Sequence, residues 1–203
     1  MLPHAILRQF GVYIHPRLLT VAQCLAWRNR LAGMQGHPGP ITKNGVPVLD
    51  QDARRVLDFV VTPAEMESLA DDIAVVRPPL ERHFQKSLGP LREARCMRYG
   101  AGDFFMPHRD AEKPDGEELY DVHRRVVSII VFLNAPDDPV VPYEGGDLTF
   151  YGLLDVPDSD QYGLSLRAEQ GMLVAFHSST VHGVSPISTG NRYVIVGMFH
   201  DQP

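Results

Sequence analysis

Hydrophobic and polar positions follow two different periods along this chain, and the change falls near residue 90. Within residues 16–34 the apolar side chains recur at roughly helical spacing, and Gly33 is placed to end the helix. These apolar positions are Leu18, Leu19, Ala22, Leu25, Ala26 and Leu31. Residues 36–47 contain many glycines and prolines, so we expect a loop there.

A second helical region begins at Thr62. Thr62 can cap the helix, Pro63 suits the first helical position, and Glu65 completes a capping box. The apolar residues that follow share one face; they are Met66, Leu69, Ile73 and Val76. The two prolines at 78–79 interrupt this helix, and we expect a further helical piece up to about residue 88.

From about residue 91 the pattern becomes a series of short strand-type runs separated by turns. The runs are rich in Val, Ile, Phe and Tyr, and they read ARCMRY, RRVVSIIVFLN, GDLTFYG, GMLVAF and RYVIVGMF. Many short strands with no helix between them predict a sandwich or barrel rather than a parallel α/β sheet. We therefore expect a mainly β protein with N-terminal helices packed on one sheet. We expect one domain, 1–203, in which residues 1–90 are a helical support for a β core at 91–203.

Composition and charge narrow the classes of partner. With 203 residues, 44% of them hydrophobic, the chain can bury one substantial core. The formal net charge is −6 and no cluster of Lys and Arg stands out, so we expect no nucleic-acid partner.

Cysteine usage and the apolar runs suggest a compartment. Cys24 and Cys96 lie far apart and match no metal-binding spacing, which favours buried thiols in a reducing environment. The N-terminus does not resemble a secretory signal. The longest apolar runs are far shorter than the roughly 20 residues of a membrane-spanning helix. We expect a cytoplasmic protein that does not enter the membrane.

Candidate chemistry begins with His108 and Asp110, two residues apart at the end of an extended segment. In a strand such residues point to the same face, so both could reach one metal ion. A single His-x-Asp pair arises easily by chance in a chain with 9 histidines, and the pair therefore needs a third ligand. His182 is our candidate, although taken alone it could equally be a histidine at a sheet edge. His177 has no role in such a motif, and we interpret it as structural or as a neighbour of the site.

Arg192 strengthens the case for a site. It opens the last strand and by alternation shares a face with Val194 and Val196. A guanidinium on an apolar inward face must be paired, because an isolated buried charge is very costly. Its partner would be an internal Asp or Glu, or the carboxylate of a bound small molecule, which the planar fork of arginine suits. Two histidines and one carboxylate on one side of a metal suit ferrous iron, and zinc remains an alternative.

The order of these segments resembles a known family. RYGAGDFFMPHRD at 98–110, RRVVSIIVFLN, EGGDLTFYG at 144–152, and GMLVAFHSSTVHGVSPISTGNRYVIVGMFH resemble the Fe(II)- and 2-oxoglutarate-dependent oxygenases. The most similar branch is the prolyl 4-hydroxylase-like one, and the match covers about 91–200. The resemblance implies a double-stranded β-helix, or jelly roll, with His108, Asp110 and His182 as the metal ligands.

The same resemblance assigns residues to the cosubstrate. It implies that Arg192 pairs with the distal carboxylate of 2-oxoglutarate. Tyr99 takes the place of a tyrosine that often hydrogen-bonds the cosubstrate in this branch, although core packing with Met97 explains it equally well. Leu148 would pack near the iron, and a plain core role remains open for it too.

One position departs from the branch. Some relatives have a tyrosine near the position of Phe132, and its hydroxyl meets the cosubstrate. Phe132 cannot make that hydrogen bond, so another residue would have to donate it. Ser128 lies on the same strand face by alternation and is our candidate.

The implied activity is that of a 2-oxoglutarate-dependent dioxygenase that hydroxylates an unactivated C–H bond. Fe(II), 2-oxoglutarate and O2 would be required, with ascorbate as a supporting reductant, and 2-oxoglutarate would be decarboxylated to succinate. The substrate would be a prolyl residue, a free amino acid or another small molecule, and a homodimer is compatible with the sequence. The alternative is a non-catalytic or zinc-dependent jelly-roll (cupin-like) protein that binds a small carboxylate. For substrate recognition we consider the acidic, irregular segments 111–123, 134–145 and 153–161, which could equally be solvated connections.

Overall fold

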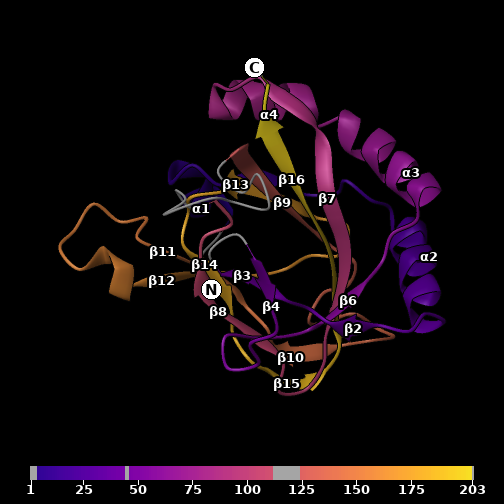
Figure 1. Ribbon diagram of the computed structural model, residues 1–203. Coiled ribbons are helices and arrows are strands. Elements are labelled where there is room, and N and C mark those ends of the chain that lie inside the picture. The colour runs from indigo at the N-terminus through magenta and orange to yellow at the C-terminus, as the bar shows by residue number, and fades with distance from the viewer. Residues whose placement is uncertain (1–3, 44–45, 112–123, 203) are drawn as a thin grey trace.

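The computed structural model describes residues 4–43, 46–111 and 124–202. Two β-sheets face each other, and a layer of helices covers the outer face of the larger sheet (Figure 1). This is the predicted jelly-roll architecture with helices on one side. Among the described residues, no helix is long and apolar enough to cross a membrane.

The larger sheet has seven strands in the order β1-β13-β9-β16-β7-β6-β2. In that order the strands are Tyr13–His15, Leu173–His177, Arg125–Phe132, Arg192–Asp201, Leu88–Tyr99, Leu57–Phe59 and His37–Pro38. Every neighbouring pair is antiparallel. The long strands β9, β16 and β7 form its centre.

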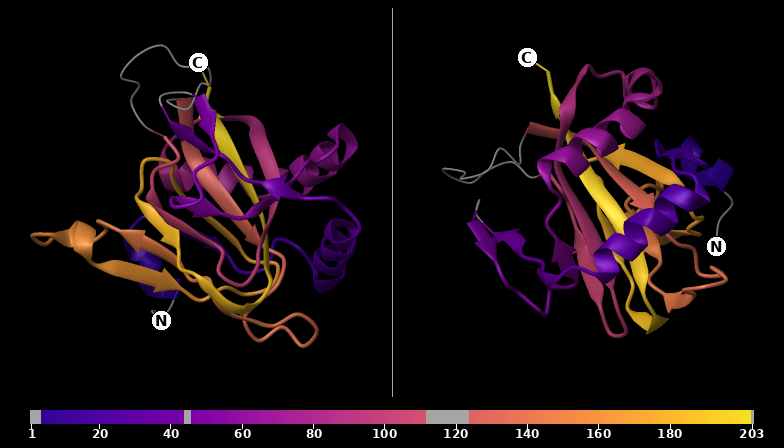
Figure 2. Two further views of the ribbon diagram at one scale, coloured as in Figure 1. Left: turned by 60° about the horizontal axis from the view of Figure 1, so that its bottom comes forward. Right: turned by 90° about the vertical axis from the view of Figure 1, so that its right-hand side faces the viewer.

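The smaller sheet has five strands in the order β12-β11-β14-β8-β5. They are Gly163–Leu166, Leu148–Tyr151, His182–Val184, Phe104–His108 and Arg54–Arg55. Two short ribbons complete the β structure: β10 (Tyr143–Gly145) with β15 (Ile187–Gly190), and β3 (Ile41–Lys43) with β4 (Val46–Val48). The β11–β12 hairpin, which carries the short helix η2 (Ser159–Gln161), projects from the body of the molecule (Figures 1 and 2).

Helices α2 (Val21–Ala32), α3 (Pro63–Ala74) and α4 (Arg77–Phe84) lie over the larger sheet, as the right-hand view of Figure 2 shows. A further short helix, α1, spans His4–Gln9. The outer core joins buried helix residues such as Leu69 and Leu80 to Val127, Ile129 and Val131 of β9.

The inner core lies between the two sheets, and strand alternation decides which residues enter it. Along β9, Ile130 and Phe132 point inward, toward Leu148 and Phe150 of the smaller sheet. On β16, Val194 belongs to the inner core, whereas Tyr193 and Ile195 belong to the outer core. The period of two in these strands therefore produces two cores from one sheet, as expected of a sheet covered on both faces.

The helix starts follow local sequence signals. Thr62 caps α3, Pro63 opens it, and Thr62 and Glu65 form the predicted capping box. The first long helix starts later than predicted: Thr20 caps α2 with a capping box of its own, completed by Gln23. Residues 16–19 thus precede the helix. The hydroxyl of Thr20 accepts from the backbone N–H of Gln23, which in a longer helix would donate to the carbonyl of residue 19.

The N-terminal part is less helical than expected. Strands β1 to β6 all lie before residue 60, and the predicted loop at 36–47 contains β2, β3 and the start of β4. Helix α4 ends at Phe84, four residues before the expected end, and strand β7 begins at Leu88. Each of these early strands has two or three residues, too short to display a period in the sequence. They form because edges of longer strands, such as β7 and β13, offer them hydrogen-bond partners.

Candidate metal centre

Three side chains from two neighbouring strands meet at one end of the inner core. His108 ends β8, Asp110 follows two residues later, and His182 begins β14. Strands β8 and β14 are paired, and His182 lies directly opposite His108. One potential ligand atom from each of the three lies within 4.8 Å of the others. The fold therefore brings together the three residues that the sequence suggested.

Both imidazoles are oriented by their own backbone. Nδ1 of His108 lies 2.9 Å from the carbonyl oxygen of Met106, and Nδ1 of His182 lies 3.0 Å from that of Thr180. A carbonyl only accepts, so each Nδ1 carries the proton. Each Nε2 is then the basic nitrogen, and each lies 3.5 Å from a carboxylate oxygen of Asp110. The hydrogen bond from Nδ1 to a backbone carbonyl is the kind of contact that usually orients a metal-bound histidine.

Gly183 allows the two ligand strands to approach. A Cβ at this position would lie 3.0 Å from the carbonyl oxygen of Phe105 and 3.1 Å from the nitrogen of Pro107. Both contacts are with backbone of β8, which cannot move aside as a flexible side chain would. The strand register also shifts between His182 and Val184. A residue with a side chain would push His182 away from His108.

Asp110 is fixed by neighbours on the larger sheet. Its backbone N–H donates to the carbonyl of Ser178, and its own carbonyl accepts from Arg125 at 2.8 Å. Burial alone would raise the pKa of the carboxyl. At the low pH where the carboxyl would take up a proton His182 is charged, and that charge, with the hydrogen bonds of His108 and Ser128, outweighs burial and holds the pKa well below its usual range. The carboxylate is therefore ionised and suited to a cation.

His182 is held in its neutral form. Burial lowers its pKa to about 4, and the charge of His108 acts in the same direction, while Asp110 opposes them. A neutral imidazole is the form that binds a metal. Aromatic rings enclose the pair: Phe105 stacks on His108 at 3.5 Å between ring centres, and Phe176 lies 4.5 Å from His182. His177 lies outside this group; it is exposed, and its ring contacts Phe84 instead.

Arg192 is buried in the inner core without a carboxylate. Its side chain is 1% exposed, and its three guanidinium nitrogens have no hydrogen-bond partner among the described residues. The guanidinium lies 5.1 Å from the ring centres of both Tyr99 and Phe132. Ring faces attract a cation but accept no hydrogen bonds of ordinary strength. Such a buried charge calls for an anionic partner that enters from outside.

The other predicted cosubstrate residues occupy different parts of this core. Tyr99 ends β7 opposite Arg192 and is 3% exposed. Leu148 is buried in the same cluster. The hydroxyl of Ser128 lies 2.9 Å from that of Ser178 and hydrogen-bonds Asp110. The hydroxyl of Ser128 therefore lies beside the metal-ligand cluster. The sequence had suggested it as a hydrogen-bond donor to the cosubstrate in place of a tyrosine at Phe132.

A group of residues at the metal site escaped the sequence analysis. Glu93 pairs with Arg125 and lies 3.1 Å from Nε2 of His200, while Arg125 also holds the carbonyl of Asp110. Glu93 has a left-handed backbone, with φ of 55°, beside a register shift between β7 and β16. An acidic residue in a strand gives no sign of such a bulge, so only the fold reveals this support.

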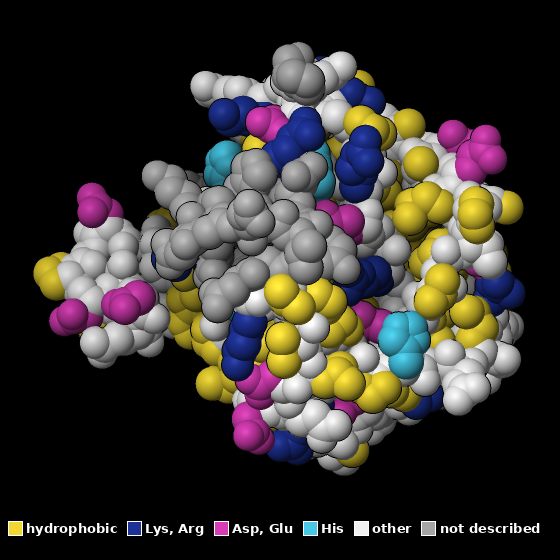
Figure 3. Space-filling view, viewed as in Figure 1, with side chains coloured by type: hydrophobic (Ala, Val, Ile, Leu, Met, Phe, Trp, Pro, Cys, Tyr) yellow, Lys and Arg dark blue, Asp and Glu magenta, His cyan; other side chains and the backbone are white. Residues whose placement is uncertain are grey.

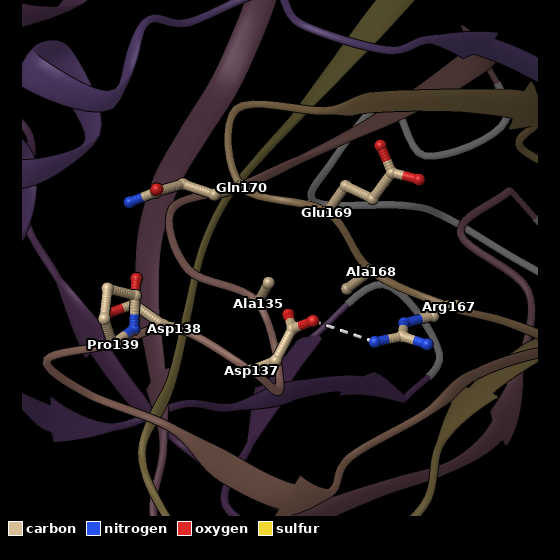
Figure 4. A pocket seen from close by; sticks show the side chains of 8 residues that line it. All are labelled: Ala135, Asp137, Asp138, Pro139, Arg167, Ala168, Glu169 and Gln170. Atoms are coloured by element: carbon tan, nitrogen blue, oxygen red, sulfur yellow. Dashed lines mark hydrogen bonds and ion pairs between the residues drawn. The ribbon is translucent and has the colours of Figure 1, made fainter.

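The loops expected near the substrate are partly described. Of 111–123, only Ala111 is described, and the rest lies outside the described residues. Segment 134–145 forms one wall of a surface pocket with Asp137 paired to Arg167 at 2.9 Å (Figure 4). The pocket is lined by Ala135, Asp137, Asp138, Pro139, Arg167, Ala168, Glu169 and Gln170. His108, Asp110 and His182 do not line this pocket, so it is separate from the candidate metal centre.

The donor set itself indicates a class of metal. Two imidazoles and one carboxylate on one side leave further coordination positions free for other ligands. This set is typical of non-haem Fe(II) oxygenases. The buried guanidinium of Arg192 in the same core has no partner among the described residues, and its planar fork can bind a carboxylate.

Comparison with known proteins supports this chemistry. The family model described as "2OG-Fe(II) oxygenase superfamily" matches residues 94–200, more than half of the chain. A PKHD-type hydroxylase of Thioalkalivibrio sulfidiphilus is 32% identical over 184 residues, which cover 87% of this chain and 72% of the relative. A PKHD-type hydroxylase of Crocosphaera subtropica is 30% identical over 68% of this chain and 57% of its own length. The chain spans about half the length of several of these curated relatives.

Solved structures share the fold. A prolyl-4-hydroxylase of Pseudomonas putida superimposes with a TM-score of 0.69 at 19% identity and covers 95% of this chain and 94% of its own. HygX of Streptomyces hygroscopicus, solved with nickel and 2-oxoglutarate, superimposes with a TM-score of 0.67 at 15% identity. The match covers 100% of this chain and 88% of HygX. On the matched sequence, the fold and the donor set, this chain belongs to the 2OG-Fe(II) oxygenase superfamily.

Proposed function

We propose that this protein is a hydroxylase in which His108, Asp110 and His182 hold Fe(II) and Arg192 binds the distal carboxylate of 2-oxoglutarate. Fe(II), 2-oxoglutarate and O2 are the cofactor, cosubstrate and oxidant of its family. One observation carries the proposal: a cluster of two imidazoles and a carboxylate shares the inner core with a buried guanidinium that has no partner. A zinc hydrolase would need the metal ligands but would have no use for such an arginine.

Each residue has a task in this proposal. The two Nε2 atoms and the Asp110 carboxylate bind the metal, since both Nδ1 protons are engaged by backbone carbonyls. Arg192 orients the cosubstrate by charge and by its planar fork. When bound, the iron, 2-oxoglutarate and O2 together oxidise a C–H bond to an alcohol as 2-oxoglutarate becomes succinate and CO2.

The pocket around the cosubstrate is built from the inner core. We assign Tyr99 and Leu148 to its walls, because both belong to the apolar cluster around Arg192. We assign Ser128 to the end near the metal, because its hydroxyl meets Asp110. These buried walls exclude water from the reacting groups.

The substrate we propose is a prolyl residue, a free amino acid or another small molecule. The structural relatives support this range: their names describe a prolyl hydroxylase in complex with a peptide fragment of hypoxia inducible factor, and HygX with hygromycin B. We further propose that residues 1–203 act as one domain, since β1, β2 and β6 are part of the larger sheet. The mass in solution tests for the homodimer that the sequence allows.

A cytoplasmic location and the absence of a nucleic-acid partner also belong to this proposal. The described cysteines, Cys24 and Cys96, are both buried free thiols, in keeping with a reducing compartment. On the face seen in Figure 3, Lys and Arg side chains are scattered among acidic and apolar ones, without a continuous basic stripe. The net charge of −6 points the same way.

The proposed function is tested by succinate formation. Purified protein with Fe(II), ascorbate and 2-oxoglutarate should release succinate slowly even without substrate. Arg192→Met should raise the concentration of 2-oxoglutarate needed for half-maximal turnover by at least tenfold, because it removes the charge that binds the distal carboxylate. Unchanged dependence on 2-oxoglutarate in this variant would refute the role of Arg192. A screen of amino acids and peptides for a mass gain of one oxygen would then identify the substrate class.

A further inference from the structure

Tyr143 is a buried residue close to Arg192 in the inner core. It begins β10 and is 3% exposed. Its partner in the neighbouring strand β15 is Gly190, two residues before Arg192. A Cβ at Gly190 would lie 2.9 Å from Cα of Tyr143 and still closer to the carbonyl oxygen of Pro142. The missing side chain at 190 thus lets the backbone of Tyr143 sit against the start of β16.

The two glycines that follow in the chain, Gly145 and Gly146, form a turn close to the side chain of Arg192. A Cβ at Gly146 would lie 3.2 Å from Cδ of Arg192. Gly145 and Gly146 both have positive φ, a conformation that glycine adopts without strain. The Gly-Gly turn therefore brings β10 alongside the stem of Arg192.

One buried asparagine fixes both partners. The Asn134 side-chain amide donates to the carbonyl of Val141 at 2.9 Å and to that of Asn191 at 2.8 Å. Its oxygen accepts from the backbone N–H of Tyr193 at 2.8 Å. Asn134 thus holds the residues on both sides of Arg192 and the chain just before Tyr143. The relative position of the phenol and the guanidinium is set by a fully buried group.

The phenol lies within reach of the guanidinium. Burial raises the pKa of Tyr143, while the charge of Arg192 and contact between the two side chains lower it. The hydroxyl therefore keeps its proton at neutral pH and can donate it. Even with this neighbour, the three nitrogens of Arg192 lack a hydrogen-bond partner. The guanidinium carries only donors and the protonated phenol offers one more, so a carboxylate that binds beside them can accept from both.

We propose that the hydroxyl of Tyr143 donates a second hydrogen bond to the distal carboxylate of 2-oxoglutarate, beside Arg192. This rests on the proposed function, since it assumes that the cosubstrate binds at Arg192. Through this hydrogen bond Tyr143 would favour 2-oxo acids that carry a second carboxylate at the far end of the carbon chain. Phe132, whose ring also lies against the guanidinium, has no hydroxyl and contributes only its ring face.

The test measures binding of two keto acids by calorimetry, without turnover. The protein is loaded with Mn(II) in place of Fe(II) and titrated with 2-oxoglutarate and with 2-oxopentanoate, which has the same carbon chain but no distal carboxylate. Tyr143→Phe should weaken 2-oxoglutarate binding by roughly tenfold to a hundredfold, as expected for a lost hydrogen bond to a charged group. It should leave 2-oxopentanoate binding unchanged. Tyr193→Phe, a buried tyrosine on the opposite face of the sheet, is the matched control and should change neither affinity.

The two keto acids separate a contact from a structural effect. An equal loss of affinity for both would assign Tyr143 a structural role and overturn the inference, as would an unchanged affinity for 2-oxoglutarate. Partial unfolding of the variant would lower the fraction of binding sites but not the ratio of the two affinities. If the Mn(II)-loaded wild type bound no 2-oxoglutarate, the proposed function would fail and this inference with it. Tight binding by the wild type with an unchanged Tyr143→Phe would reject this inference alone.

Discussion

Residues of the same type differ in chemistry according to their surroundings, and His182 and His177 illustrate this. Both follow the GMLVAF run, but His182 is 4% exposed and faces Asp110, whereas His177 is exposed and packs on an aromatic ring. The backbone carbonyl at Thr180 fixes the His182 ring with Nε2 toward the carboxylate. A metal ligand needs an oriented imidazole whose free nitrogen faces the other ligands, and of these two histidines only His182 is placed in this way.

This difference predicts the metal affinity of two alanine variants. His182→Ala should weaken Mn(II) binding by more than the 10- to 100-fold typical of a lost outer-shell partner, because it removes a direct ligand. His177→Ala should bind Mn(II) as the wild type does. Calorimetric titration of metal-free protein under anaerobic conditions measures both. Wild-type affinity in His182→Ala would show that the ligand is misassigned.

At the scale of the element, helix ends and loops hold the layers in register. Glu65 completes the capping box of α3 and also pairs with Arg30 of α2, so one side chain joins two helices. Arg28 of α2 reaches the other way, to Asp138 in the segment that leads to Tyr143. Helix α2 thus connects the outer layer to the segment that leads to Tyr143, beside the proposed cosubstrate pocket.

The capping box of α3 predicts a modest effect on stability. Thr62→Ala removes the acceptor for the N–H of Glu65 and should cost about 1 kcal/mol. For a domain of this size, that lowers the melting temperature by roughly 2–4 °C. Ser68→Ala, at an exposed position of the same helix, is the control and should leave the melting temperature unchanged or slightly raised. Equal melting temperatures for wild type and Thr62→Ala would mean that the cap contributes nothing.

The Arg28–Asp138 pair predicts a pH dependence. The carboxylate lies 2.6 Å from Nη1 of Arg28 and accepts from the N–H groups of Val140 and Val141. Burial would raise the pKa of Asp138, but these hydrogen bonds and the charge of Arg28 hold it below the ordinary value of 3.8. A depressed pKa in the folded state gives stability that is complete above about pH 4 and lost as the pH falls through the folded pKa.

Asp138→Asn is the variant that measures this contribution. It leaves Arg28 buried without its counter-charge, which should cost about 3–5 kcal/mol at pH 7. The difference from the wild type should shrink as the pH falls below about 4, because the unfolded chain then binds a proton at Asp138 that the folded carboxylate resists. Urea unfolding at pH 7 and at about pH 3 measures it. A difference that did not depend on pH would exclude the ion pair as its cause.

At the scale of the whole molecule, one sheet separates two cores with different tasks. The outer core joins the helices to the larger sheet, and the inner core lies between the sheets and holds Arg192 and the metal-type ligands. Strand alternation assigns each residue of β9 and β16 to one core or the other. Stability and site can therefore be altered separately.

Leu80 tests the contribution of the outer core. It is fully buried where α4 meets the sheet, so Leu80→Ala should lower the free energy of unfolding by about 2–5 kcal/mol. Val75→Ala, at a position 63% exposed, should change it by less than about 0.5 kcal/mol. Urea unfolding of the metal-free proteins gives both values. Equal stability of Leu80→Ala and the wild type would show that the helical layer adds little to the fold.

The sequence by itself determined the features that depend on local patterns. The alternation in β9 and β16, the capping box at Thr62 and the inward position of Arg192 follow from chemistry within a few neighbouring residues. His108 and Asp110 could be paired from their spacing, His182 was the candidate third ligand, and the family resemblance implied the same three residues. The short strands before residue 60 could not be predicted, because their hydrogen-bond partners lie on distant parts of the chain.

Tertiary structure alone decided which distant groups meet. Glu93 supports Arg125 through a strand bulge that no residue in the sequence announces. Ser128 faces Asp110 rather than the space beside Phe132, since strand alternation fixes a face but not a position along the pocket. Tyr143 reaches Arg192 because two glycine contacts and Asn134 bring separate loops together. Burial and proximity across the fold, which set charge and hydrogen bonding, are properties of packing and not of local sequence.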